Sequence, residues 1–128
     1  MGIVRLLSWN VNGIRAVHRK GELAKIFENK PEIVCIQETK ANEDQLSAEI
    51  KDIEGYQSYF VSAEKKGYSG VAVYTQNSPA KVGNGFGVER FDSEGRVLVA
   101  EFKTFTLLNI YYPNGKASKE RLKYKLDF

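Results

Sequence analysis

Two short segments place oxygen-bearing side chains where predicted strands end. The segment Ser8–Ala16, with Asn10 and Asn12 near its start, follows an apolar stretch over residues 3–7. A second apolar stretch, residues 33–36, runs into Gln37 and then Glu38. In open α/β sheets, ligands gather outside the carboxyl ends of the strands. Two amides and one carboxylate there favour a hard cation such as Mg²⁺, although an Asn-x-Asn-Gly segment alone is more typical of a turn.

Five segments together resemble the exonuclease III branch of the endonuclease/exonuclease/phosphatase superfamily, the abasic-site repair nucleases. They are Ser8–Ala16, Ile36–Lys40, Gly67–Ala72, Glu94–Val97 and Asn109–Gly115. The combination of Trp9–Ala16 with the run Tyr68–Gly70 is specific to the DNA-repair branch, and the resemblance extends from Arg5 to the last residue. It implies an α/β fold that forms half of a four-layer αββα sandwich.

The resemblance also implies roles for individual residues. Glu38 aligns with the metal-binding glutamate of the family, and Asn10 aligns with an asparagine that supports the metal site, so both are expected to hold Mg²⁺, with Mn²⁺ as an alternative ion. Asn12 stands where some relatives have Asp and is assigned a supporting role. Tyr111 aligns with the active-site tyrosine whose hydroxyl lies against the scissile phosphate. Because strand side chains alternate, Tyr112 is expected to face the other way and to pack. The predicted catalytic residues are therefore Tyr111, Asn10 and Glu38.

Six other residues match positions that contact double-stranded DNA. Arg15, Lys20 and Arg96 match backbone contacts, and Tyr68 matches a minor-groove residue. Asn114 matches a contact to the phosphate at the cleavage position, and Lys116 lies where relatives insert a residue at the lesion. Such contacts position a duplex without reading its sequence. For any one of the cations, the alternative is an ordinary surface charge.

Residues that the resemblance requires elsewhere are missing from the sequence. Family members carry an Asp-x-Asn pair and a terminal Asp-His pair in their second half, but the only histidine here is His18 and no acidic-x-Asn follows Tyr111. The sequence stops at Asp127-Phe128 in a helical pattern without a stop signal. Residues 1–128 are therefore predicted to be the N-terminal part of one domain, with the C-terminal half supplied in cis or in trans.

The predicted function is that of a Mg²⁺-dependent nuclease that cleaves DNA at abasic sites, with 3′-exonuclease or 3′-phosphodiesterase activity, in base excision repair. Because the base for the attacking water is missing, this stretch alone is expected to be inactive. One alternative is a non-catalytic nucleic-acid-binding or folding module. A phosphatase of a sister branch is disfavoured by Arg15-Ala16 and by the run Tyr68–Gly70.

Composition agrees with an intracellular protein, cytoplasmic in a prokaryote or nuclear in a eukaryote. No apolar run approaches the roughly 20 residues of a membrane span, and no leader opens the chain. The single cysteine, Cys35, lies in an apolar strand and is expected to be a reduced core thiol. The net charge is +3, and residues 115–128 hold five basic against two acidic side chains. That excess suits a polyanion-binding surface, although a solvated helix with lysines would look the same.

Alternating elements must position these residues. The pattern predicts a strand over 3–9, a helix over 17–29 and a strand over 33–37. A capping box of Asn42 and Gln45 should open a short helix that buries Leu46 and Ile50. A period of two then predicts strands over 56–62, 70–75, 81–86, 96–103 and 106–112. Finally, Ser118 should cap a helix whose apolar face includes Leu122 and Leu126.

These elements should form a mixed, mostly antiparallel sheet with flanking helices. One face of this sheet is expected to pack against a second sheet from the absent half. Left uncovered, that face should drive self-association.

Overall fold

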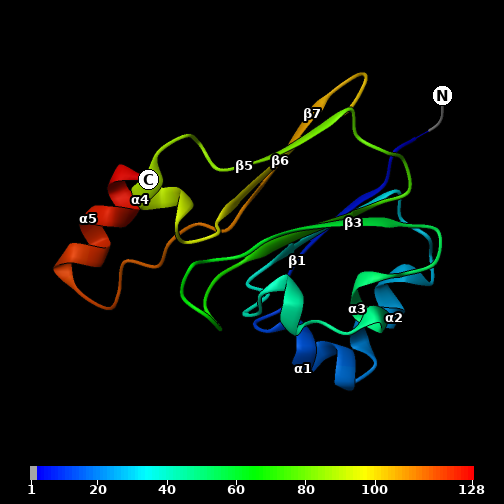
Figure 1. The fold of residues 1–128 in the computed structure, drawn as a ribbon, viewed down its shortest axis with the longest axis horizontal. Coiled ribbons are helices and arrows are strands. Elements are labelled where there is room, and N and C mark those ends of the chain that lie inside the picture. The colour runs from blue at the N-terminus through cyan, green and yellow to red at the C-terminus, as the bar shows by residue number, and fades with distance from the viewer. Residues whose placement is uncertain (1–2) are drawn as a thin grey trace.

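The computed structural model describes residues 3–128 and shows two β-sheets packed face to face (Figure 1). The first sheet has the strand order β1-β2-β4-β3, with β1 and β2 parallel and the other pairs antiparallel. Its strands are β1 (Leu6–Asn10), β2 (Ile33–Gln37), β3 (Gln57–Val61) and β4 (Val71–Thr75). The second sheet is an antiparallel meander of β5 (Lys81–Asn84), β6 (Val97–Glu101) and β7 (Thr106–Ile110).

Helices cover the outer face of the first sheet (Figure 1). They are α1 (Ile14–Arg19), α2 (Glu22–Phe27), the 3₁₀ turn η1 (Glu43–Gln45) and α3 (Ala48–Lys51). Two more helices, α4 (Glu89–Asp92) and α5 (Lys119–Asp127), lie together at one end of the second sheet. The outer face of β5, β6 and β7 has no helix over it within residues 3–128.

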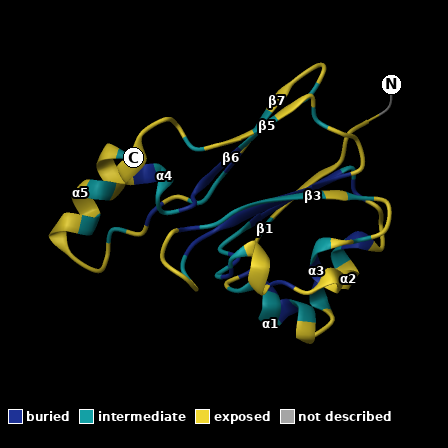
Figure 2. Cartoon of the chain, viewed as in Figure 1, coloured by how far each residue is buried: buried dark blue, intermediate teal, exposed yellow. Residues whose placement is uncertain are grey.

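The central strands β2 and β4 are buried on both faces, which explains their continuous apolar sequences (Figure 2). Val34 and Ile36 of β2 face the helices, and Trp9 of β1 packs against the same cluster. Cys35 faces the second sheet and contributes to the cluster between the sheets. It is a free, buried cysteine, as predicted, and burial raises the pKa of its thiol to about 11.

The strands predicted from the sequence are all present, but the helix predicted over 17–29 is wrong in extent. It consists of α1 and α2, because Gly21 adopts a left-handed conformation with φ 77° between them. The capping box is confirmed, since the Asn42 N–H donates to Gln45 Oε1 at 2.9 Å. Leu46 and Ile50 are buried as expected.

The second sheet also differs from expectation, because it is built by this chain rather than by an absent half. The strand pattern could not distinguish a meander that continues one sheet from a meander that folds over it.

The last helix begins as predicted, with Ser118 Oγ accepting the Arg121 N–H at 3.1 Å, but it packs through another face. Tyr124 and Phe128 meet Phe91 of α4, with ring centroids 5.2 Å apart in both pairs. Leu122 and Leu126, predicted to form the packed face, are exposed. No helix within residues 3–128 is long and apolar enough to span a lipid bilayer.

Candidate functional site

Three loops meet where β1 and β2 end and β4 begins. Because β1 and β2 are parallel, their carboxyl ends lie side by side, and antiparallel β4 starts at the same edge. Backbone hydrogen bonds join the loops: Gly13 N to Glu38 O at 2.8 Å, Ile14 N to Thr39 O at 3.0 Å, Thr39 N to Gly70 O at 3.1 Å and Lys40 N to Ser69 O at 2.8 Å. The loops therefore form one framework around Glu38.

Unusual backbone conformations concentrate in this framework. Five non-glycine residues have positive φ in the described chain, and four of them lie in these loops: Asn12, Glu38, Lys40 and Ser69, with φ of 49°, 61°, 53° and 53°. Left-handed conformations are sparsely populated by residues other than glycine, and they persist only where the surrounding structure holds them. Their concentration here indicates a functional site.

Glu38 lies at the centre of the polar contacts, with its side chain 16% exposed. The Tyr111 hydroxyl donates to Glu38 Oε1 at 3.0 Å, and Lys40 Nζ lies 3.1 Å from Oε2. Lys40 also donates to Asn12 Oδ1 at 2.6 Å. Burial would raise the pKa of Glu38, but hydrogen bonds from Lys40, Tyr111 and Asn10 outweigh it and lower that pKa. Glu38 is therefore ionised at neutral pH.

Tyr111 follows β7 and reaches Glu38 from the second sheet. Burial, and then the hydrogen bond to the Glu38 carboxylate, raise the pKa of Tyr111, so its hydroxyl keeps its proton at neutral pH. Tyr112 faces away, as the alternation predicts, but it is not a core residue: it is 66% exposed, and its ring makes a T-shaped contact with that of Phe128.

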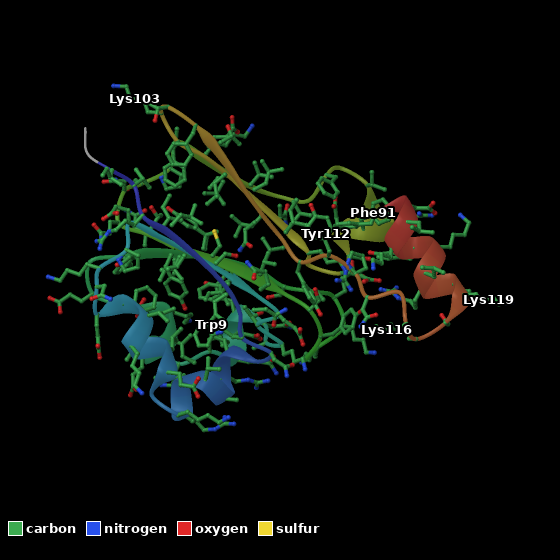
Figure 3. All side chains as sticks on the ribbon, turned by 180° about the vertical axis from the view of Figure 1, so that it is seen from behind. Trp9, Phe91, Lys103, Tyr112, Lys116 and Lys119 are labelled. Atoms are coloured by element: carbon green, nitrogen blue, oxygen red, sulfur yellow. The ribbon has the colours of Figure 1, made fainter. Side chains whose placement is uncertain are left out.

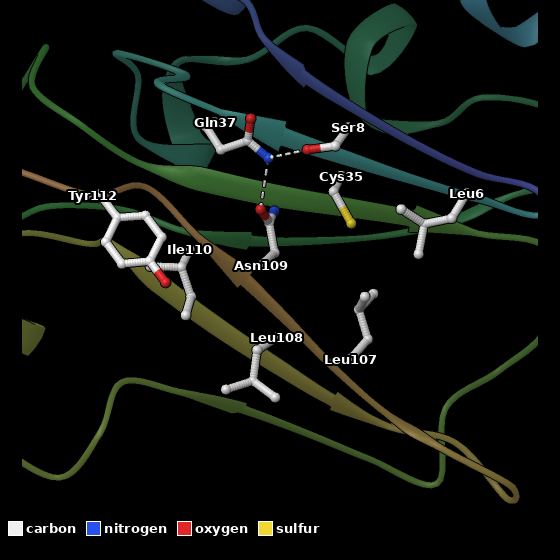
Figure 4. Close-up of a pocket in the computed structure, with 9 residues that line it drawn as sticks. All are labelled: Leu6, Ser8, Cys35, Gln37, Leu107, Leu108, Asn109, Ile110 and Tyr112. Atoms are coloured by element: carbon white, nitrogen blue, oxygen red, sulfur yellow. Dashed lines mark hydrogen bonds between the residues drawn. The ribbon is translucent and has the colours of Figure 1, made fainter.

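Polar side chains form a hydrogen-bonded bridge between the two sheets, next to the segments that carry Glu38 and Tyr111 (Figure 4). Gln37 donates to Ser8 Oγ at 3.0 Å and to Asn109 Oδ1 at 2.8 Å. Asn109 is buried and donates in turn to the carbonyls of Ile36 and Ala72. Ser8, Gln37 and Asn109 line a cavity of about 270 Å³ that opens between the β1 and β7 edges. The bridge fixes β7, and with it Tyr111, relative to β2 and Glu38.

Arg96, predicted to contact the DNA backbone, is enclosed by other residues of the chain. It is 2% exposed, and its guanidinium donates to the Tyr111 carbonyl at 3.1 Å and to the Tyr68 hydroxyl at 3.0 Å. This enclosure differs from the surface position that a DNA backbone contact suggests, and that contact stays a prediction. The Tyr68 hydroxyl likewise faces the protein interior, where Arg121 also reaches it.

Comparison with known proteins decides the family. Residues 7–127 match the Endonuclease/Exonuclease/phosphatase family. The chain belongs to this family. It is 41% identical over 126 residues to the exodeoxyribonuclease of Bacillus subtilis, covering 98% of this chain and 49% of that protein. It is also 41% identical over 124 residues to the DNA repair nuclease APEX1 of Danio rerio, covering 95% and 40%.

Solved structures agree. The catalytic domain of Xenopus laevis APE2 superposes with a TM-score of 0.84 at 33% identity, covering 98% of this chain and 50% of that one. An AP endonuclease from Archaeoglobus fulgidus superposes with a TM-score of 0.83 at 31% identity, covering 98% and 48%. The predicted branch and fold class of this Endonuclease/Exonuclease/phosphatase family member are thus confirmed. The chain spans about half the length of these relatives.

The donor set of this family member fits one side of a magnesium site. Glu38 offers an ionised carboxylate and Asn10 an amide oxygen, the ligand types that Mg²⁺ takes together with water and phosphate. Asn10 Oδ1 is already used by the Asn12 N–H at 3.0 Å, which fixes its orientation. Residues 3–128 contain no cluster of three or more His, Cys, Asp or Glu that could hold a metal ion.

The remaining predicted DNA contacts lie in three environments. Arg15 is half-buried and donates to the Lys40 carbonyl at 3.0 Å, whereas Lys20 is exposed at the end of α1. Asn114 and Lys116 are exposed in the loop before α5, where the Lys116 N–H donates to Asn114 Oδ1 at 2.8 Å. Figure 3 shows Lys116 in this loop. Contact of these residues with DNA stays a prediction.

The sequence interpretation missed Lys40 as a residue of the site and missed the contact between Glu94 and Arg121. Lys40 belongs to the segment Ile36–Lys40, but its position in the sequence does not reveal its left-handed backbone. Nor does it reveal that the ammonium group contacts Glu38. Glu94 lies in the segment Glu94–Val97, but its partner Arg121 is 27 residues away in the sequence, so no local pattern links the two.

Proposed function

We propose that this chain forms the part of a Mg²⁺-dependent DNA-repair nuclease that holds the ion and the phosphate. The proposed reaction is cleavage of the backbone at abasic sites, with 3′-exonuclease or 3′-phosphodiesterase activity. Relatives named as exodeoxyribonuclease and AP endonuclease support the nuclease class. The observation that carries the proposal is the convergence of Tyr111 and Lys40 on Glu38, at 3.0 and 3.1 Å, inside a framework of left-handed residues.

Phosphodiester hydrolysis needs an activated water, neutralisation of charge at phosphorus and support for the departing oxygen. A bound Mg²⁺ would supply Lewis-acid stabilisation of that charge. Glu38 would hold the ion with Asn10 beside it. The Tyr111 hydroxyl, protonated at neutral pH, can donate to a phosphate oxygen, and the Lys40 ammonium adds positive charge within reach of Glu38.

Activation of the water requires a further group. Glu38, Asn10 and Tyr111 are an ion ligand, an amide and a hydrogen-bond donor, and none of them suits the role of general base. The only histidine, His18, lies on α1, where it pairs with Glu49 at 3.3 Å. We therefore propose that residues outside this stretch, supplied in cis or in trans, complete the catalytic set. That requirement also favours the second candidate, in which the chain alone acts as a nucleic-acid-binding half.

An incision assay on a duplex with one tetrahydrofuran abasic analogue tests the proposal. The 128-residue chain alone should incise negligibly with Mg²⁺, and the second half of a relative, added in trans, should restore EDTA-sensitive incision. In the mixture, Glu38→Gln should lower incision by about 10² or more, because the neutral amide loses the charge that holds Mg²⁺.

Glu43→Gln is the matched control, because Glu43 is exposed in η1 and the same charge is removed. This variant should keep its activity. Equal incision by Glu38→Gln and the native chain throughout a Mg²⁺ titration would remove Glu38 from the site. Robust incision by the chain alone would show that no further group is needed.

A further inference from the structure

One carboxylate, Glu94, holds two arginines at once in the turn that leads into β6. Its two oxygens accept from Arg121 in a bidentate pair, Nη1 to Oε2 at 2.9 Å and Nη2 to Oε1 at 3.0 Å. Oε1 also accepts from Arg96 Nε at 2.9 Å. Hydrogen bonds between ionised partners are stronger than neutral ones, and bidentate pairs add directional control. Glu94 therefore fixes the orientation of both guanidinium groups.

The oriented Arg96 guanidinium in turn contacts two tyrosines, Tyr111 and Tyr68. Its Nη1 donates to the Tyr111 carbonyl and its Nη2 to the Tyr68 hydroxyl, while its own carbonyl accepts the Tyr111 N–H at 2.8 Å. The guanidinium carbon lies 4.9 Å from the Tyr111 ring centroid and 5.7 Å from that of Tyr68. The buried Arg96 guanidinium thus contacts both the backbone of Tyr111 and the side chain of Tyr68.

Arg121 extends the same arrangement to α5. Its guanidinium carbon lies 4.2 Å from the Tyr124 ring centroid, and its Nη2 donates to the Tyr68 hydroxyl at 3.3 Å. The loop with Asn114 and Lys116 runs between Tyr111 and α5, so both of its ends are tied to Glu94. Among the described residues, Glu94 is the only acid paired with Arg96 or Arg121. Removing its charge would leave Arg96 buried without a counterion.

We propose that Glu94 is a positioning residue for DNA binding, acting through Arg96 on Tyr111 and Tyr68 and through Arg121 on the loop of Asn114 and Lys116. This inference rests on the proposed function, since it assigns to Glu94 the geometry of residues expected to meet DNA. Glu94 itself does not meet the substrate.

The sign of the effect of Glu94→Gln on DNA affinity separates positioning from electrostatics. DNA is a polyanion, so removing a negative charge should strengthen binding if charge alone mattered. Positioning predicts the opposite: Glu94→Gln should bind the abasic-analogue duplex roughly tenfold more weakly, because the contacting groups are misplaced. The slope of log affinity against log salt should stay unchanged, since no phosphate contact is removed.

Glu120→Gln is the matched control, because Glu120 is exposed on α5, next to Arg121, and the same charge is lost. It should bind as tightly as the native chain or more tightly. Tyr68→Phe removes only the hydroxyl, which accepts from both arginines and donates to Glu94 Oε1 at 3.4 Å. It should weaken binding several-fold, which keeps the test open if Glu94→Gln fails to fold. The folded fraction of each variant is measured by thermal unfolding, and affinities are then expressed per folded molecule. Binding by Glu94→Gln and Tyr68→Phe as tight as that of the native chain would overturn the positioning role.

Amide hydrogen exchange at Tyr111 separates this inference from the proposed function. Its N–H is bonded to Arg96, so it should exchange at least about tenfold faster in Glu94→Gln than in Glu120→Gln. If the native chain fails to bind the abasic duplex, the proposed function fails, and this exchange measurement alone decides the role of Glu94. Equal exchange in the two variants would overturn it.

Discussion

Arg15 and Lys20 share a predicted role but differ in surroundings. Arg15 already donates to the Lys40 carbonyl, so it stabilises the loop beside Glu38 as well as carrying charge. Lys20 extends from the end of α1 and is exposed. The same substitution should therefore have different consequences at the two positions.

Lys20→Ala should reduce the slope of log affinity against log salt by about one unit if one phosphate contact is lost. Arg15→Ala should reduce the slope similarly and also speed amide exchange in the 37–41 loop, because its tie to Lys40 is gone. DNA binding across a salt series, with exchange on the free chain, measures both effects.

Lys25→Ala supplies the comparison for these variants, since Lys25 is exposed on α2. The slope of log affinity against log salt for Lys25→Ala should match that of the native chain. If the slopes of Lys20→Ala and Arg15→Ala match it as well, both residues are ordinary surface cations.

The convergence of Glu38 and Asn10 could be predicted because both stand where strands end, and that of Tyr111 because its segment resembles the family's active-site segment. The environment of Arg96 could not be predicted, because its burial depends on Tyr68 and Arg121, which are 28 and 25 positions away in the sequence. A local pattern shows that an arginine is present but not whether distant residues enclose it.

At the scale of elements, the turn before β4 is the tightest junction of the site. Gly70 has φ 91°, and a Cβ there would collide with the Thr39 side-chain oxygen. The close approach allows the backbone bond from Thr39 N to the Gly70 carbonyl, which holds the Glu38 loop against β4.

Gly70→Ala should lower the free energy of unfolding by about 2–4 kcal/mol, because it combines a left-handed backbone with overpacking. Denaturant unfolding measures the change. Gly83→Ala is the control: a Cβ there meets nothing within 4 Å, so its effect should stay within about 0.5 kcal/mol. Equal stability of the two variants would show that the turn can relax.

Periodicity predicted the strands because each carries its own apolar pattern. It did not predict α4, since the four residues Glu89–Asp92 are too few to show a helical period. Asp92 instead organises that segment by accepting the N–H groups of Phe86 and Gly87 at 2.8 and 2.9 Å.

At the scale of the whole molecule, the two sheets cover each other, but the outer face of the second sheet is open. Leu108 on that face is 51% exposed, and Val99 lies opposite it on β6. At the β1 edge, Leu6 and Leu7 are exposed as well. Large contiguous exposed apolar patches mark interaction sites, and a patch formed by these residues is expected to favour self-association.

The 128-residue chain should therefore self-associate at micromolar concentration, and Leu108→Lys should shift it towards monomer in sedimentation velocity. Leu126→Lys is the matched control, because Leu126 is 75% exposed but lies on α5. A native chain that sediments as a monomer would contradict the expectation, as would equal shifts by both variants.

Trp9, which packs against the helix-side cluster from β1, is the only tryptophan in the chain and directly precedes Asn10. Its indole is half-buried, so its emission depends on how closely β1 stays seated on the helices. The protein therefore carries an intrinsic fluorophore one residue from its proposed ion-binding amide. Titrations of cation or duplex can be followed through that emission without attaching a dye.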